Sequence, residues 1–351
     1  MTQVQTGITR RRILQGAVAA GSAGLWYSSP WAFAQGAPLI RLQKLHCFEL
    51  RVSDPERSLA FYQDLFGMRL LSRFGGRISL QIGDSSQLMS LRACGPDETP
   101  AITHIGFSVQ DYNLDALRQS LDRLGYARGD APPLSEPGIQ HTMKQWVRMR
   151  SGTPELYFSD ARGLIVQLVD GRYCGGSGPL GADCAAPAPV KPGIFQLAEL
   201  NHFTAFVSDG AGANRYWQET FGLRVQAEQG PGSAVNGIGD GFQFVMFAGG
   251  FGGGGRNAAP TPANLHHGSI NMHGFDEHEI LEKLTDYGLK ARGDGPVGPL
   301  MHYVSRRMPE RGGAEGGTPE VYFTDPDGIL MQVQDITYCG GGGYLGSECR
   351  A

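Results

Sequence analysis

The sequence has no strong excess of charge of either sign. Its 351 residues contain 30 Lys and Arg and 34 Asp and Glu, which gives a formal net charge of −4 at pH 7. No block rich in Lys and Arg follows the N-terminal region. A nucleic-acid-binding surface needs a concentrated positive potential, so we expect no nucleic-acid partner.

The sequence also lacks a long apolar run. The run at residues 13–26, ILQGAVAAGSAGLW, is rich in Gly and Ser and is shorter than the roughly 20 residues that a membrane-spanning helix needs. It follows Arg10 and Arg11 in TRRRILQ and precedes the small residues of AFA at 32–34. This order resembles a twin-arginine export signal more than a membrane anchor. We therefore expect cleavage of residues 1–34 and a periplasmic mature protein with no stable membrane span after cleavage.

The most informative feature is a long internal repeat. Residues 153–184 align with residues 318–349 without a gap, from TPELYFSD and TPEVYFTD to GADC and GSEC. The stretch LHCFELRVSD at 45–54 likewise resembles LNHFTAFVSD at 200–209. Such a repeat indicates a duplicated structural unit. We predict a first module at 35–184, a Pro- and Ala-rich linker at 185–199 and a second module at 200–351.

Each module begins with the pattern of a half-buried strand followed by a helix. Apolar Phe48, Leu50 and Val52 alternate with other residues, and a period of two is typical of a strand with one buried face. A helix is expected to start where Asp54 precedes a proline and to stop at Gly67. A second strand–helix unit, further strands and a closing hairpin follow in each module.

With these elements in place, the sequence resembles the vicinal oxygen chelate superfamily. The resemblance lies in the opening RVSDPERSLAFYQDLFGM, the closing hairpin YFTDPDG and the order strand, helix, strand, strand, strand. The superfamily includes glyoxalase I, fosfomycin and bleomycin resistance proteins and extradiol dioxygenases. The resemblance implies an α+β fold in which tandem βαβββ units form two curved sheets. It also implies metal ligands on the concave face, on the first strand of each half-module and on the last strand.

Strand alternation selects three residues of the second module for these ligand positions. His202, His267 and Gln332 alternate with core residues and are expected to face the concave side, which predicts two imidazoles and one amide oxygen around a metal ion. His266 is expected to face away from this side, and His46 shares the core face of its strand and is excluded.

The matching positions of the first module hold a poorer set of donors. They are Cys47, His104 and Gln167. We interpret the first module as a degenerate partner that supports the fold. The asymmetry resembles extradiol dioxygenases, in which only the second module carries iron.

Three further residues are candidates for the chemistry. Glu320 shares a strand face with Tyr322 and is an expected extra ligand, the alternative being a solvated residue at a strand edge. The resemblance to extradiol dioxygenases implies that Tyr322 hydrogen-bonds a metal-bound catecholate, the alternative being a packed tyrosine. His302 is a candidate for acid–base work or a surface histidine. Two departures weigh against ring cleavage: Glu315 lies near the place of a signature histidine, and no histidine lies in the glycine-rich stretch before His267.

The six cysteines suit an exported protein. The spacing C-G-G-x-G-x-L-G-x-x-C occurs twice and predicts two disulfides in an oxidising compartment, since no histidine accompanies it to favour a metal site. The predicted pairs are Cys174 with Cys184 and Cys339 with Cys349. Cys47 and Cys94 are then expected to be buried free thiols.

Two classes of function follow from this sequence. The first is a metal-dependent enzyme that chelates vicinal oxygens of a small substrate, with one divalent ion per chain: Fe(II) first, or Mn(II) or Zn(II). An oxygenase acting on a small phenolic compound is the leading version, and a lyase or isomerase of glyoxalase type is the alternative. The second class is a metal-free protein that binds a small molecule. The sequence leaves open whether modules pair within one chain or between the chains of a homodimer.

Overall fold

The structure is a computed structural model that describes residues 37–133, 141–186, 190–249 and 263–350. The expected export signal at 1–34 lies outside these residues, as does part of the predicted linker. Residues 37–351 form one compact unit. In the part of the chain that is described, no helix is both long and apolar enough to cross a lipid bilayer.

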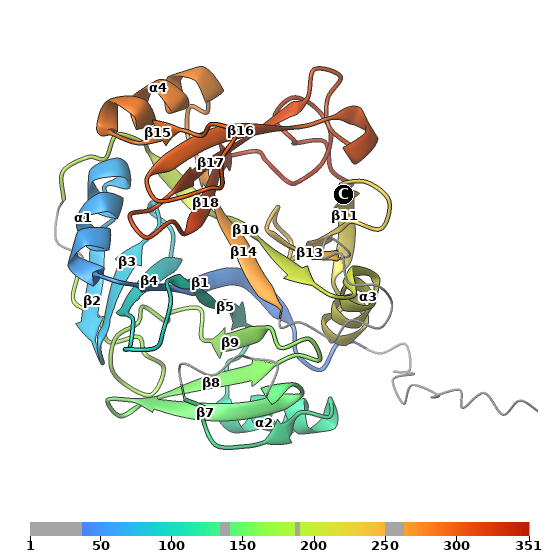
Figure 1. Cartoon of the computed structure of the whole chain (residues 1–351). Coiled ribbons are helices and arrows are strands. Elements are labelled where there is room, and N and C mark those ends of the chain that lie inside the picture. The colour runs from blue at the N-terminus through green and yellow to red at the C-terminus, as the bar shows by residue number, and fades with distance from the viewer. Residues whose placement is uncertain (1–36, 134–140, 187–189, 250–262, 351) are drawn as a thin grey trace, which may run out of the picture. The chain divides into compact units, whose positions relative to one another are not determined.

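The first nine strands form one mixed sheet in the order β2-β3-β4-β1-β5-β9-β8-β7-β6 (Figure 1). Its strands are β1 Leu42–Val52, β2 Leu70–Phe74, β3 Arg77–Gln81, β4 Leu88–Ala93, β5 Ala101–Val109, β6 Ala127–Arg128, β7 Lys144–Arg150, β8 Thr153–Ser159 and β9 Ile165–Val169. Its helices are α1 Pro55–Phe66 and α2 Leu114–Arg123.

The second sheet repeats this order as β11-β12-β13-β10-β14-β18-β17-β16-β15. Its strands are β10 Leu197–Val207, β11 Arg224–Glu228, β12 Ala234–Gly237, β13 Phe244–Gly249, β14 Asn264–Met272, β15 Lys290–Ala291, β16 Met301–Arg307, β17 Thr318–Thr324 and β18 Leu330–Asp335. Its helices are α3 Gly210–Phe221, α4 Glu277–Tyr287 and the short 3-10 helix η2 Pro309–Arg311. The predicted α+β fold of tandem βαβββ units is therefore confirmed.

The ends of α1 show how the local sequence sets these elements. The Asp54 carboxylate accepts hydrogen bonds from the backbone N–H groups of Glu56 and Arg57, and Pro55 occupies the first helical turn. Gly67 ends the helix with φ of +59°, a left-handed conformation that glycine adopts without steric cost. The predicted start and stop of this helix are confirmed.

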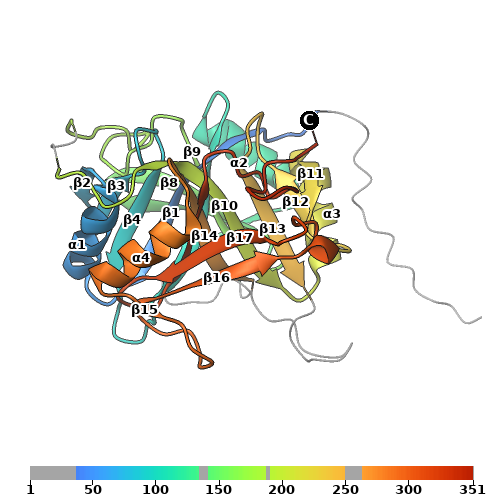
Figure 2. The same cartoon turned by 90° about the horizontal axis from the view of Figure 1, so that it is seen from above.

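The first helix of each module packs against the opposite module. Phe66 of α1 lies 5.5 Å, ring centroid to ring centroid, from Phe323 of β17, and the Tyr287 hydroxyl of α4 donates to Asp64 of α1 (Figures 1 and 2). In the reciprocal contact, Trp217 Nε1 of α3 donates to Asp160 Oδ2 at 2.9 Å. One continuous hydrophobic core therefore joins the two sheets.

Candidate functional site

A cavity of about 480 Å³ opens on the concave face of the second sheet. We call it the second-module cavity. Strands β10, β14, β17 and β18 supply several of its polar residues, among them His202, Thr204, His267, Glu320, Tyr322 and Gln332. The three residues predicted as metal ligands are thus brought together, and their role as ligands stays a prediction.

The two imidazoles of this cavity are held in defined orientations. The rings of His202 and His267 lie 5.5 Å apart, centroid to centroid, at 84° to each other. His202 Nδ1 lies 2.6 Å from the Asn201 side-chain oxygen, and His267 Nδ1 lies 2.9 Å from Nδ1 of His266. These contacts at Nδ1 orient both rings. In the tautomers in which Nδ1 of His202 and of His267 carries the proton, each Nε2 lone pair is available, which is the arrangement that metal-ligating histidines adopt.

Burial keeps both imidazoles uncharged. It lowers the pKa of His202 to about 3, from an ordinary value of 6.5. It also lowers the pKa of His267 well below 6.5, and the neighbouring His202 and His266 add to this effect. A neutral imidazole is the form that binds a metal ion, so both side chains are ready to ligate at neutral pH.

Gln332 is the third member of the set, and its side chain lies beside both imidazoles. Its residue is 1% exposed, and neither Oε1 nor Nε2 makes a hydrogen bond of standard geometry with a described residue, although the amide is close enough to His202 and His267 to oppose the lowering of their pKa values. A buried amide left unpaired costs about 1–3 kcal/mol, so its oxygen gains from an electrophilic partner in the cavity. Two neutral imidazoles and a free amide oxygen fit a divalent ion that accepts nitrogen and oxygen ligands.

The donor set depends on this amide. Within residues 37–133, 141–186, 190–249 and 263–350, no group of three or more His, Cys, Asp or Glu side chains could hold a metal ion. Without a ligand carboxylate, the set offers no negative charge to the ion.

Glu320 lines the same cavity, but its carboxylate is already engaged. Arg307 Nε donates to Glu320 Oε1 at 3.0 Å, the Tyr322 hydroxyl donates to Oε2 at 3.2 Å, and the Tyr338 hydroxyl donates to Oε1 at 3.3 Å. This network neutralises the carboxylate and orients Tyr322. The expectation that Glu320 is an extra ligand is therefore not favoured by the geometry.

His302 is not among the residues that line the second-module cavity. It is buried, it pairs in register with Phe323, and its Nε2 lies 2.9 Å from the hydroxyl of Thr285 on α4. It therefore occupies the helix-packed face of β16, while neighbouring Tyr303 stacks on Tyr322 at the cavity side. Neither the acid–base role in this cavity nor the exposed position expected for His302 agrees with this placement.

His266 does line the cavity, and the expectation that it faces away is wrong. The register between β10 and β14 shifts after Thr204 and His267, so that Ala205 pairs with Leu265 and His266 becomes an extra residue. Such a bulge breaks the strict alternation of side chains. His266 is half-buried at the cavity and stacks on Phe206 at 4.3 Å.

The corresponding face of the first module is filled. Its cavity measures about 40 Å³. His104 Nε2 lies 3.3 Å from Gln167 Oε1, and Cys47 Sγ lies 3.6 Å from the same oxygen, so the three predicted residues do meet. Here the amide oxygen already has partners within the chain, unlike that of Gln332.

A buried ion-pair network occupies the space that is open in the second module. Arg77 bridges Glu49 and Glu155, with 2.9 Å from its Nη1 to Glu155 Oε2, and Arg92 Nε lies 3.3 Å from Glu49 Oε1. By strand register, Thr204 of the second module replaces Glu49, and Ala248 replaces Arg92. Ser233, the residue before β12, takes the place of Arg77 if the register of β12 and β13 is continued by two residues beyond Val235. Replacement of long charged side chains by small ones opens the second-module cavity.

Both predicted disulfides are present. Cys174 is bonded to Cys184 and Cys339 to Cys349. Cys47 is a buried free thiol, and Cys94 is a half-buried one. Arg307 Nη2 donates to the carbonyl oxygen of Gly341, inside the second disulfide-closed loop, so this loop supports the network around Glu320.

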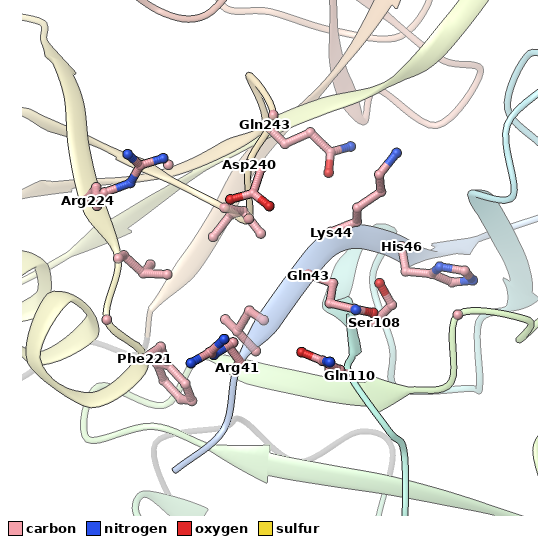
Figure 3. Close-up of a pocket in the computed structure, with 18 of the residues that line it drawn as sticks. Arg41, Gln43, Lys44, His46, Ser108, Gln110, Phe221, Arg224, Asp240 and Gln243 are labelled. Atoms are coloured by element: carbon pink, nitrogen blue, oxygen red, sulfur yellow. The ribbon is translucent and has the colours of Figure 1, made fainter. Parts of the chain in front are cut away.

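A larger cleft, of about 860 Å³, contains none of the predicted ligands. Figure 3 shows Lys44 and His46 of β1 on one side of it and Asp240 and Gln243 on the other. Its charges are of both signs, and Lys44 Nζ lies 3.9 Å from Glu199 Oε2. We therefore place the candidate site in the second-module cavity.

Comparison with known proteins agrees with this architecture. Residues 44–142 match the family model of the Glyoxalase/Bleomycin resistance protein/Dioxygenase superfamily. The fold is that of the vicinal oxygen chelate proteins. The chain is also 26% identical, over 130 residues, to the glutathione transferase FosA of Serratia marcescens, a match that covers 36% of this chain and 80% of that protein.

Solved structures resemble most of the chain. Homoprotocatechuate 2,3-dioxygenase from Brevibacterium fuscum, in complex with 3,4-dihydroxyphenylacetate, is 18% identical, with a TM-score of 0.53, and the match covers 85% of this chain and 82% of that chain. The Mn(II)-bound glyoxalase from Novosphingobium aromaticivorans is 16% identical, with a TM-score of 0.55, covering 84% and 82%. At these identities the likeness establishes the shared fold.

Proposed function

We propose that the protein is an exported, metal-dependent enzyme of the vicinal oxygen chelate type. His202, His267 and Gln332 hold one divalent ion, Fe(II) in the leading version and Mn(II) or Zn(II) otherwise. The observation that carries this proposal is the convergence of the buried Gln332 amide, which makes no hydrogen bond of standard geometry, with two neutral imidazoles in an open cavity. When bound, the ion supplies Lewis-acid polarisation of adjacent substrate oxygens and, in the case of iron, oxygen chemistry.

The leading activity is that of an oxygenase acting on a small phenolic compound. The cavity volume suits a small molecule, and the likeness to a dioxygenase complexed with 3,4-dihydroxyphenylacetate supports an aromatic ligand. Tyr322 borders the space for the ligand, with its hydroxyl held by Glu320. We assign proton transfer to His266, the half-buried imidazole of the cavity, in place of His302.

A lyase or isomerase of glyoxalase type is the second candidate. It is favoured by the neutral donor set, because an ion without a carboxylate ligand is a stronger Lewis acid and polarises a carbonyl more strongly. The third candidate, a metal-free binding protein, rests on the lack of a third His, Cys, Asp or Glu ligand in the described residues.

Export is part of the proposal. Two disulfides close glycine-rich loops, and disulfides of this kind persist in oxidising compartments such as the periplasm. They support the export signal predicted at residues 1–34.

The test is elemental analysis of protein purified without added metal, alongside two matched variants. We expect about one metal ion per chain, lost in His267→Ala and kept in His104→Ala, the equivalent change in the filled first module. Iron would support the oxygenase, and zinc or manganese would support the lyase or isomerase. A metal-free wild-type protein would contradict the proposal of a metal-dependent enzyme and would leave the proposal of a metal-free binding protein.

A further inference from the structure

The second module carries an insertion beside its open cavity. In the first module, β7 and β8 are joined by Ser151 and Gly152, whereas residues 308–317 join the equivalent strands β16 and β17. The insertion includes helix η2. The last residue of this helix, Arg311, lines the second-module cavity. The two modules therefore differ in this loop as well as in the side chains that fill the first one.

The inserted loop is fixed to the body of the protein. Buried Arg307 donates from Nη1 to the carbonyl oxygen of Gly312 at 2.9 Å. The backbone N–H groups of Gly312 and Gly313 donate to the carbonyl oxygens of Pro309 and Met308, at 2.9 and 3.0 Å. These bonds close the turn on both sides of Arg311 and hold its backbone at the cavity.

Arg311 is the unbalanced charge of this cavity. The Glu320 carboxylate is paired with Arg307, while the guanidinium of Arg311 forms no ion pair or side-chain hydrogen bond with any described residue. The proposed metal ligands add no negative charge. Arg311 is an exposed residue at the edge of the cavity. An unpaired guanidinium at this place favours an anionic ligand, because a planar guanidinium binds a carboxylate through two parallel hydrogen bonds.

The wall of the cavity also offers apolar surface on which an aromatic ring could pack. Phe206, Pro231, Met246 and Ala248 contribute apolar surface. Aromatic rings and a methionine thioether pack favourably on a ligand ring.

We propose that the ligand of this site is a small aromatic acid, whose carboxylate pairs with Arg311 and whose adjacent oxygens lie toward His202, His267 and Gln332. This inference rests on the proposed function, which it narrows to an anionic substrate class. Arg311 is then a specificity-determining residue supplied by the insertion.

The test compares two ligands that differ only in the carboxylate, protocatechuate and catechol. Binding to the purified protein is measured by isothermal titration calorimetry near neutral pH and at low salt. We expect protocatechuate to bind up to about fivefold more tightly than catechol, because an ion pair with an exposed guanidinium is screened by solvent. Arg311→Gln is expected to remove this preference without weakening catechol, and Arg311→Glu to reverse it. Glu310→Gln, an exposed change in the same turn, is the control and should keep the preference.

The outcomes separate this inference from the proposed function. A preference that survives in Arg311→Gln would overturn the role of Arg311. Equal binding of both ligands to the wild-type protein, with both lost in His267→Ala, would overturn the inference and leave the metal site standing. If Arg311→Gln removes the preference while His267→Ala has no effect on either ligand, the anion site stands and the metal-dependent function is wrong. If neither ligand binds, the proposal that the ligand is a small aromatic acid is wrong.

Discussion

At the scale of single residues, the side chain of Gln332 sets the charge of the candidate metal site. An amide offers an oxygen ligand without the negative charge of a carboxylate. We predict that Gln332→Glu raises the affinity for a divalent ion by about tenfold or more, equivalent to about 1.4 kcal/mol, because the new ligand neutralises part of the charge of the ion. Competition with a chelator, followed by metal analysis, measures this change.

Gln167→Glu provides the matched control for that substitution. Gln167 holds the equivalent place in the filled first module, where His104 and Cys47 already contact its oxygen. The control should leave metal content unchanged. An equal gain in both variants would show that the effect is not specific to the second-module cavity.

Arg77 shows what fills the first module. Its side chain is 6% exposed and bridges Glu49 and Glu155. We predict that Arg77→Leu lowers the free energy of unfolding by about 3 kcal/mol, because it leaves buried Glu49 with Arg92 and buried Glu155 with Arg150 as the remaining ionic partners. Arg73→Leu removes the exposed ion pair with Glu56 and should change the free energy of unfolding far less. Urea denaturation measures both, and similar losses would contradict the view that burial decides the difference.

At the scale of elements, the closing hairpin of the second module contains a buried carboxyl group, Asp325, whose charged form is disfavoured by its surroundings. Asp325 Oδ1 accepts hydrogen bonds from the backbone N–H groups of Asp327 and Ile329, each at 2.9 Å. Burial nevertheless raises the pKa of Asp325 to about 6, from an ordinary 3.8. This group therefore favours the folded state below pH 3.8, and that contribution is lost as the pH rises through 6.

We predict that Asp325→Asn stabilises the protein near neutral pH. The asparagine oxygen can accept the same two backbone hydrogen bonds without the cost of a buried charge, so the free energy of unfolding should rise by about 1–3 kcal/mol near pH 7. The gain should largely vanish near pH 4, where folded Asp325 is protonated. Urea denaturation at both pH values measures it, and a gain that does not depend on pH would contradict the role of ionisation.

Strand patterns predicted much of the site but missed the irregular elements. Alternation placed His202, His267 and Gln332 on one face because these residues lie in regular β pairing. The same rule failed at His266, since a bulge adds a residue that alternation cannot foresee. Arg311 was missed because it lies on an insertion outside the aligned repeat, although the unequal lengths of the two connections mark the place.

At the scale of the whole molecule, the repeat predicted the number and order of the modules but not how they pack. No local pattern indicates that α1 and α3 each cover the opposite module, because the apolar face of a helix does not specify its partner. The filling of the first module was also beyond the sequence. Its charged residues are typical of a solvated surface, and only the register of three strands brings Arg77 between Glu49 and Glu155.

Because α1 and α3 each pack against the opposite module, we expect the two modules to unfold together. Trp217 is fully buried and donates to Asp160 of the first module. We predict that Trp217→Ala lowers the free energy of unfolding by about 3–5 kcal/mol and that hydrogen exchange accelerates in both β8 and β10. Exchange measured by mass spectrometry tests this. Acceleration confined to the second sheet, or two separate unfolding transitions, would contradict a shared core.

The two modules of the chain differ in how their concave faces are used: the first is filled by side chains, and the second is open. An open polar cavity lowers the stability of the second module, whereas packed side chains fill the same space in the first module. Because the two modules share one hydrophobic core, the packed first module also stabilises the second. We therefore expect the shared core, supported by the filled first module, to make substitutions that reshape the second-module cavity better tolerated.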